Sequence, residues 1–424
     1  MNQQSKYGIM PMIIIGALFF IFGFVTWLNG TLIPYLKIAC ELNTFQSLLV
    51  AFAFYISYFV MALPSSWVLE KTGFKKGMML GLLVMALGAL LFIPAANSRT
   101  YNLFLVGLFV IGTGLSVLQT AVNPYITIIG PLESAAKRIS IMGVCSKVAG
   151  VLAPIILGAI ILSDADVLIK ELATLDDVQK NIRLNNLAAR VILPYTIMAF
   201  ILAGLAIMIL FSPLPEVEFS EEQPSENIVK LKKTSVWQFP NLVFGVIALF
   251  LYVGVEVLAG DTIGSYGQTQ GIPLSVAKNF TSYTLIAMIL GYFAGILFTP
   301  KFISQEKALA ISAIIGAVFS IVVVCTNGYI SVLFIALLGF ANALMWPAIW
   351  PLAIDQLGEF TKKGSALLIM AIAGGALLPL IYGRLADISS VGPKQAYWIM
   401  FPCYCFILYY AVRGYKLRSW KLEK

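Results

Sequence analysis

The strongest constraint on the fold of this 424-residue chain is a series of apolar runs, each long enough to cross a lipid bilayer. A transmembrane α-helix needs roughly 20 mostly apolar residues, because each residue rises about 1.5 Å and the hydrocarbon core is about 30 Å thick. Six runs lie near residues 10–36, 46–69, 77–96, 102–131, 139–162 and 190–211. Six more lie near residues 239–263, 275–299, 307–325, 329–357, 364–387 and 395–413. The pattern predicts an all-α integral membrane protein with twelve transmembrane helices.

The composition agrees with this fold class. Hydrophobic residues make up 60% of the chain and charged residues only 11%, whereas a typical soluble domain is about 25% charged. The net charge of +8 comes from basic residues in short loops, and no basic-aromatic patch indicates nucleic-acid binding. The run at 10–36 is too long for the core of a signal peptide and is predicted to be the first span.

The two groups of runs repeat each other. The motif Gly-x-Leu-x-Pro-x-Ile-x-Gly begins at Gly150 in the fifth run and again at Gly375 in the eleventh, 225 residues later. A second set of matches, at an offset of 227 residues, joins the fourth run to the tenth: Gly112 to Gly339 and Pro124 to Pro351. Two matches at nearly one offset indicate a duplication.

Residues 212–238 separate the two halves and are polar, charged and proline-bearing. We therefore predict an N-terminal six-helix bundle at 1–211, a cytoplasmic linker at 212–238 and a C-terminal six-helix bundle at 239–424. Parallel six-span repeats related by an axis along the membrane normal resemble the architecture of major facilitator transporters. In that architecture the substrate binds at the midplane, between the halves.

Both chain ends are expected on one side of the membrane, because the number of runs is even. The positive-inside rule assigns that side to the cytoplasm, and we expect a multi-pass protein of a bacterial inner membrane. The basic residues on that side are Lys71, Lys75, Lys76, Lys137, Arg138, Lys230, Lys232, Lys233, Lys301, Lys307, Lys362, Lys363 and those between Arg413 and Lys424.

The chain contains no histidine, and its five cysteines are scattered. Ser-His chemistry and His-ligated metals are therefore excluded, and any proton relay must use carboxylates. We expect no metal and no cofactor other than a coupling cation, H⁺ or Na⁺. The same absence, with no paired-carboxylate motif in a loop, argues against a membrane-embedded enzyme.

Two charges lie inside apolar runs. Lys147 is about 13 Å along its helix from Arg138, near the bilayer midplane. A charge there costs at least about 2.5 kcal/mol, so Lys147 is expected to face a cavity or the bundle interior. Glu256 lies within the seventh run and is the predicted partner. The pair is predicted to bind substrate and to couple an ion; a fixed pair that only joins two helices is the alternative. Asp261, nearer the outer surface, is expected to be solvated.

Charges at the cytoplasmic ends of the runs are candidates for gating. The segment from Ser66 to Gly77 resembles the superfamily loop signature G-x-x-x-D-R-x-G-R-R, with Ser and Glu replacing its first Gly and its Asp. Such a loop can exchange salt bridges between states, although topology-determining charge explains it equally well. The candidate gating residues are Glu70, Lys71, Lys75, Arg138 and Asp355.

The closer resemblance is to the fucose:proton symporter family, which includes permeases for fucose and for glucose or galactose. It spans nearly the whole chain. The residues that carry it are Leu28-Asn29, Leu32-Ile33-Pro34, the run from Leu103 to Ile111, Gln119-Thr-Ala-Val-Asn123-Pro124, Gly130-Pro131, Arg138-Ile-Ser, Tyr252-Val-Gly254, Gly291-x-x-x-Gly295, Gly374-Gly375 and Pro379.

Two positions depart from the fucose-type pattern. Fucose-type members resemble N-x-L-N-D in the first span and E-T-A-x-N-P in the fourth, and those carboxylates serve proton coupling and sugar binding. Here the corresponding residues are Gly30 and Gln119, neither of which titrates. The resemblance implies that Asn29 and Asn123 keep sugar-contacting roles.

A sugar site needs amides or hydroxyls for the sugar hydroxyls and an aromatic plane for the C–H face. The candidate amides are Asn29, Gln119, Asn123 and Asn279, and the candidate planes are Trp27, Trp346 and Trp350. Core packing or an interfacial belt is the alternative for each tryptophan.

Together these features predict a hexose transporter of the major facilitator fold, which works by alternating access with proton or sodium symport and is functional as a monomer. Glucose or galactose is favoured; fucose and amino sugars are possible. A facilitated uniporter and a nontransporting sugar sensor are the alternative functions.

Overall fold

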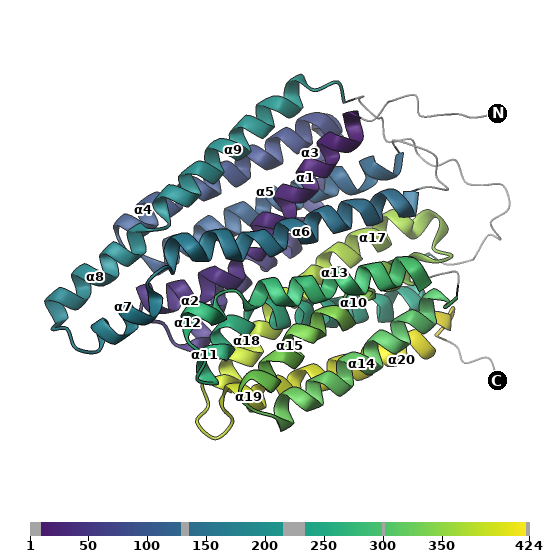
Figure 1. The fold of residues 1–424 in the computed structure, drawn as a ribbon. Helices are drawn as coiled ribbons and strands as arrows, with labels where there is room; N and C mark the ends of the chain where they lie inside the picture. The colour runs from purple at the N-terminus through teal and green to yellow at the C-terminus, as the bar shows by residue number, and fades with distance from the viewer. Residues whose placement is uncertain (1–9, 129–134, 215–233, 299–301, 421–424) are drawn as a thin grey trace.

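The computed structural model describes residues 10–128, 135–214, 234–298 and 302–420. The first half of the chain forms one bundle (Figure 1), drawn from purple to teal. Its helices are α1 (Met10–Trp27), α2 (Asn29–Ala39), α3 (Thr44–Leu90), α4 (Phe92–Asn97), α5 (Tyr101–Ile128), α6 (Ala135–Ile161), α7 (Ala165–Leu172), α8 (Asp177–Ala189) and α9 (Ile192–Phe211).

The second half forms a second bundle, drawn from green to yellow in Figure 1. Its α-helices are α10 (Pro240–Asp261), α11 (Ile263–Thr269), α12 (Leu274–Ala277), α13 (Phe280–Phe298), α14 (Gln305–Cys325), α15 (Gly328–Asn342), α16 (Met345–Ile354), α17 (Thr361–Met370), α18 (Gly374–Ala386), α19 (Gly392–Ala396) and α20 (Met400–Val412). Short 3₁₀ turns are η2 (Val236–Gln238), η3 (Gly358–Phe360), η4 (Ala371–Ala373), η5 (Tyr397–Ile399) and η6 (Gly414–Lys416).

The all-α membrane fold is confirmed. Eleven stretches of helix in the described residues are long and apolar enough to span a membrane, and one of them, Thr44–Asn97, has 54 residues, enough for two passes. That stretch bends at Gly73, whose φ of 74° lies in the left-handed region that glycine adopts readily. Counting this stretch twice gives the twelve expected crossings. The predicted linker falls mostly on residues 215–233, outside the described ranges, so the domain boundaries stay a prediction.

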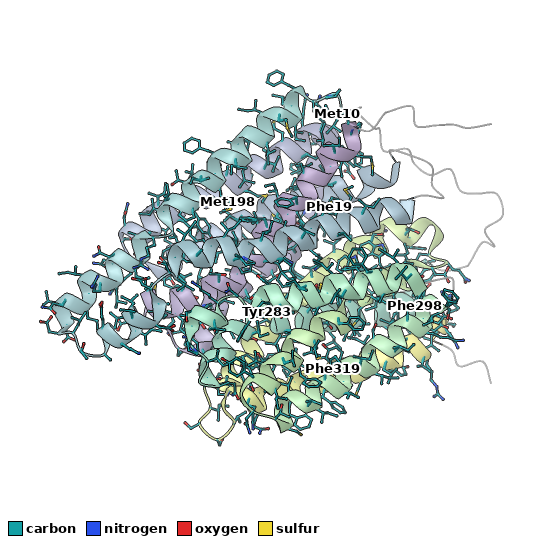
Figure 2. All side chains as sticks on the ribbon, in the orientation of Figure 1. Met10, Phe19, Met198, Tyr283, Phe298 and Phe319 are labelled. Carbon is teal, nitrogen blue, oxygen red and sulfur yellow. The ribbon has the colours of Figure 1, made fainter. Side chains whose placement is uncertain are left out.

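Large apolar side chains cover the outside of both bundles. Phe200 is 73% exposed, Phe211 80% and Leu297 66%. Figure 2 shows such side chains projecting from the surface, among them Tyr283 and Phe298 of α13. Exposed patches of this extent are typical of surfaces that contact lipid, and together with the apolar helices they make this a multi-pass membrane protein.

The two ends of the molecule are distinct. Helix α1 begins, α9 ends, α10 begins and α20 ends at one end (Figure 1), which we call the terminal end. The opposite end, which we call the far end, carries the α2–α3 turn, the helices α7 and α8, and the α18–α19 turn.

The glycines of the repeated motif all lie within contact distance of the other bundle. A Cβ atom at Gly150 would lie 3.0 Å from Leu285 Cδ1, and one at Gly375 would lie 3.1 Å from Tyr55 Cγ. The second glycines are placed alike: Gly158 lies against Lys278, and Gly383 against Phe45. The duplication therefore supplies both bundles with a smooth helix, α6 and α18, at their mutual interface.

Replacing Gly150 with Ala is expected to destabilise the protein by about 1 to 3 kcal/mol, because the added methyl group overpacks a filled interface. A Cβ atom there would lie 2.5 Å from Trp27 Cδ1. The measurement is thermal unfolding in detergent. Gly204→Ala on α9 is the control, because no atom lies within 4 Å of its Cβ position; it should stabilise by roughly 0.5 to 1 kcal/mol. Equal melting temperatures for the two variants would contradict the prediction.

Candidate functional site

An ion pair crosses the interface between the bundles. Lys147 Nζ on α6 donates a hydrogen bond to Glu256 Oε1 on α10 at 2.9 Å. The side chains are only 14% and 10% exposed. Both belong to spanning helices, Lys147 near the middle of α6 and Glu256 five residues before the end of α10, so the pair joins the two halves. The same ammonium lies 4.8 Å from the centre of the Trp27 ring, within range of a cation–π interaction.

The pair lies in the wall of a cavity of about 230 Å³ between the bundles. Of the nine predicted substrate-binding residues, five line it: Trp27, Gln119, Lys147, Glu256 and Trp346. Phe19 and Phe22 of α1 and Pro347 of α16 add apolar surface on the side of the terminal end. The cavity thus combines the Gln119 amide, the charges of Lys147 and Glu256, and aromatic surfaces, which is the combination that a sugar requires.

Four predicted substrate-binding residues are not among the described lining. Asn29 is 1% exposed and lies on α2. Asn279 lies between α12 and α13 at the far end, and Trp350 stacks on Trp346 with ring centres 5.5 Å apart. Asn29, Asn279 and Trp350 therefore do not belong to the proposed sugar site. The Asn123 side chain lies outside the part of the chain that the structure describes.

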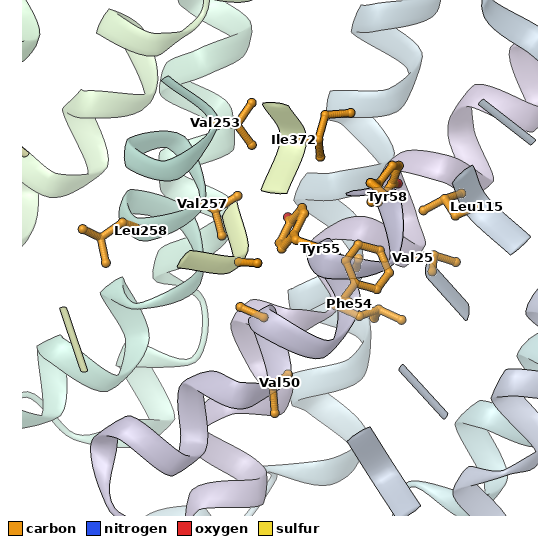
Figure 3. Close-up of a cluster of buried hydrophobic side chains, with 14 of the residues drawn as sticks. Val25, Val50, Phe54, Tyr55, Tyr58, Leu115, Val253, Val257, Leu258 and Ile372 are labelled. Carbon is orange, nitrogen blue, oxygen red and sulfur yellow. The ribbon is translucent and has the colours of Figure 1, made fainter. Parts of the chain in front are cut away.

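Tyrosines are the residues that sequence reasoning missed. Tyr55, Tyr58, Tyr252 and Tyr292 all line the cavity, which Glu256 lines too. Gln119 Nε2 donates a hydrogen bond to the Tyr58 hydroxyl at 3.1 Å. Figure 3 shows Tyr55 and Tyr58 of α3 between Leu115 of α5 and Val257 of α10. Their spacing of three residues, which places both on one helix face, was the available signal.

The predicted gating residues lie at the terminal end, and three of them, Lys71, Lys75 and Asp355, make contacts within their own bundle. Lys75 Nζ donates to the Ser212 carbonyl at 2.7 Å, Lys71 lies 3.9 Å over the Trp67 ring, and Asp355 pairs with Arg418. Glu70 lies near the end of the first pass of α3. The Arg138 side chain falls outside the described residues. These residues remain gating candidates.

Polar contacts between the bundles gather at the far end instead. Asp387 accepts hydrogen bonds from the backbone N–H groups of Thr44, at 3.1 Å, and Phe45, at 2.8 Å. These are the first two residues of α3, where a helix favours negative charge.

Two further contacts also join a charge to a helix end across the interface. Asp166 of α7 accepts from the N–H groups of Leu274, at 2.8 Å, and Ser275, at 3.2 Å. The hydrogen bonds from Ser275 hold the pKa of the Asp166 carboxyl below its ordinary value. Lys278 donates to the carbonyl of Leu162, at 3.0 Å, beyond the end of α6. The far end is therefore closed, whereas the cavity extends toward the terminal end.

One expectation at this end is wrong. Asp261, expected to be solvated, is 0% exposed. The α10–α11 bend places its side chain inside the closed far half rather than at the surface.

A two-bundle membrane protein with a central cavity and an interface that closes at one end has the architecture of a secondary transporter. The Major Facilitator Superfamily model matches residues 15–380. The glucose/galactose transporter of Brucella abortus biovar 1 is 35% identical over 98% of this chain and 96% of that protein. The L-fucose-proton symporter of Escherichia coli K12 is 29% identical over 98% of this chain and 95% of that protein. The chain therefore belongs to the Major Facilitator Superfamily, in the family of these transporters.

Solved structures agree with this assignment. A variant of the Escherichia coli fucose:proton symporter FucP superposes with a TM-score of 0.70 at 28% identity, over 96% of this chain and 98% of that chain. A D-xylose-proton symporter gives the same TM-score at 13% identity, over 98% of both chains, which shows the fold alone.

Proposed function

We propose that the protein is a proton-coupled hexose transporter of a bacterial inner membrane, with glucose or galactose as the substrate. The observation that carries the proposal is the Lys147–Glu256 pair, which joins the two bundles in the wall of an aromatic-lined cavity. The names of the relatives support the substrate class, and the L-fucose-proton symporter supports the choice of the proton.

The terminal end is taken as cytoplasmic, because basic residues gather there. The state described here is then inward-facing, since the polar contacts between the bundles lie at the far end. Sugar hydroxyls that bond to Lys147 or Glu256 would replace the bond between them, which weakens a link between the bundles. Substrate binding thereby shifts the balance between the two states. The protein is expected to act as a monomer.

Counterflow of labelled glucose and galactose into proteoliposomes tests the proposal. Purified wild-type protein should exchange at least one of the two sugars and accumulate it when the outside is made acidic. Protein-free liposomes and a sodium gradient at constant pH are the controls. Equilibration without accumulation would make the protein a uniporter, and no movement of either sugar would favour another substrate or a sensor.

Replacing Trp346 with Ala is expected to raise the KM for sugar about tenfold, because it removes an aromatic surface from the cavity and tenfold corresponds to only about 1.4 kcal/mol. Trp350→Ala should have a smaller effect, because Trp350 only supports the neighbouring ring. Initial rates of uptake over a range of sugar concentrations measure both. An equal or larger effect of Trp350→Ala would overturn the assignment of Trp346 as the contact residue.

A further inference from the structure

Asp261 carries a carboxyl group that is sealed inside the molecule. It is the last residue of α10 and is 0% exposed. Neither of its oxygens has a hydrogen-bond partner among the described residues. This contrasts with Glu256, five residues earlier on the same helix, which accepts a hydrogen bond from Lys147. Asp261 also does not line the sugar cavity.

The closed far half of the interface seals this group. A Cβ atom at Gly264 would lie 3.8 Å from the Gly30 carbonyl oxygen, so the backbones of α2 and α11 nearly touch there. The Trp27 ring packs over Gly260, which directly precedes Asp261, with its Cζ3 atom 2.3 Å from a Cβ built there. Both contacts join the N-terminal bundle to the C-terminal bundle. Opening of the far end would therefore separate them and admit water.

The surroundings are polar and incompletely paired. On the two segments that meet here, α2 and α11, three further buried atoms have no hydrogen-bond partner in the part of the chain described: Asn29 Nδ2, Thr31 Oγ1 and Ser265 Oγ. Ser265 lies four residues after Asp261, on α11. Buried polar atoms normally have hydrogen-bond partners, so these unpaired atoms indicate that the site binds a group that the protein atoms do not supply, such as water or a proton.

No described cation neutralises Asp261. Glu256, the ionisable residue five positions earlier on the same helix, is itself acidic and adds no positive charge. The ammonium of Lys147 is bonded to Glu256. An ionised carboxylate buried without a counter-charge or a donor is strongly unfavourable, whereas a carboxylic acid is neutral. The closed state thus requires the neutral form.

We propose that Asp261 is the group that carries the coupled proton, and that its protonation allows the far end to close. This inference rests on the proposed sugar transport and names its coupling residue. With the far end open, the carboxylate takes a proton from external water and an O–H bond forms. After closure the acid gives this proton to water that reaches it from the cavity on the terminal side, and the O–H bond breaks. The carboxylate is then ionised again and favours reopening of the far end.

The first test compares wild type with Asp261→Asn in proteoliposomes. A gradient of one pH unit supports up to about tenfold accumulation for one proton per sugar, because one pH unit is a tenfold difference in proton activity. Wild type should approach that ratio, and the variant should reach a ratio of about one while still exchanging sugar. Asp177→Asn, at an exposed position on α8, is the matched control and should accumulate like wild type.

The second test measures the conformation of the far end rather than transport. Spin labels at Ser98 and Tyr329, both exposed at the far end, report the separation of the bundles. In wild type the closed fraction should rise as the pH falls, because protonation favours closure. In Asp261→Asn it should stay high at every pH, because the amide cannot ionise. A separation that depends on pH equally in both proteins would overturn the proposal and move the titrating group elsewhere, with Glu256 the first alternative.

The outcomes distinguish the proposed function from the assignment of Asp261. If wild type moves no sugar, the proposed function fails, while the pH-dependent closure still tests Asp261. If wild type accumulates sugar and Asp261→Asn accumulates it equally, the assignment of Asp261 is wrong and the proposed function stands. Accumulation driven by sodium at constant pH and lost in the variant would replace the proton with a sodium ion and refute the proton assignment.

Discussion

Replacing Lys147 with Met is expected to destabilise the folded protein by about 3 to 5 kcal/mol, because it leaves the Glu256 carboxylate buried without its partner. The pair is well shielded, with side chains only 14% and 10% exposed. Sugar accumulation should be lost in the same variant. Chemical or thermal unfolding in detergent measures the first effect, and gradient-driven uptake measures the second.

The double variant Lys147→Met/Glu256→Gln separates stability from function. It should recover most of the lost stability, since no unpaired charge remains, and it should still fail to accumulate sugar. Lys180→Met is the matched control, because Lys180 forms an exposed pair with Glu41, 36% and 48% exposed; its loss should cost less than about 1 kcal/mol. A double variant that accumulates sugar normally would reduce the buried pair to a structural link.

Replacing Asp387 with Asn is expected to open the far end. The carboxylate accepts two backbone N–H groups at the start of α3, and the amide retains at most one acceptor oxygen. Because the residue is partly solvated, the loss should be about 2 kcal/mol in total, roughly a thirtyfold shift toward the open state. The label separation between Ser98 and Tyr329 measures the shift directly.

Asp176→Asn provides the comparison for this prediction. Asp176 accepts from the backbone N–H of Gln179 at 2.8 Å and so caps the start of α8, within one bundle. It has the same chemistry as Asp387 but does not cross the interface. Its replacement should lower stability by about 1 kcal/mol and leave the separation of the bundles unchanged. Equal opening by both variants would show that the far-end contacts do not control the state.

The Asp387 and Asp261 variants should change the far end in opposite directions. Loss of the Asp387 carboxylate removes bonds that exist only in the closed state, whereas loss of the Asp261 charge removes an obstacle to that state. Their combination should lie between the two single variants if both act on the same equilibrium.

Much of the fold could be predicted from the sequence because its signals are local. An apolar run of bilayer length must form a helix, since backbone polar groups have no partner in lipid except along the same helix. The duplication was visible because Gly150 and Gly375 recur at a fixed offset. The cost of a charge at membrane depth likewise singled out Lys147 and Glu256, and the structure places their charged atoms 2.9 Å apart.

The site residues that could not be predicted from the sequence depend on how the helices cross. Tyr55 and Tyr58 are indistinguishable in sequence from core tyrosines, and only the packing of α3 against both α5 and α18 places them at the cavity. Asn279 was a candidate sugar ligand because it is an amide in a spanning run. The structure places it between α12 and α13, at the far end of the molecule and away from the cavity. In the sequence, nothing distinguishes Asp387 and Asp166 from ordinary loop charges. Only the structure shows their hydrogen-bond partners in the other bundle.

The sequence by itself thus determined the helices, their number, their pairing into two related halves and the two charges that had to meet between them. It could do so because the bilayer penalises every unpaired polar group and charge, which leaves few alternatives for a chain of this composition. Tertiary structure alone decided which end is closed, which aromatic side chains form the cavity, and that Asp261 is buried rather than solvated. These properties depend on contacts between segments more than 100 residues apart, and no local pattern encodes which of two bundle arrangements makes them.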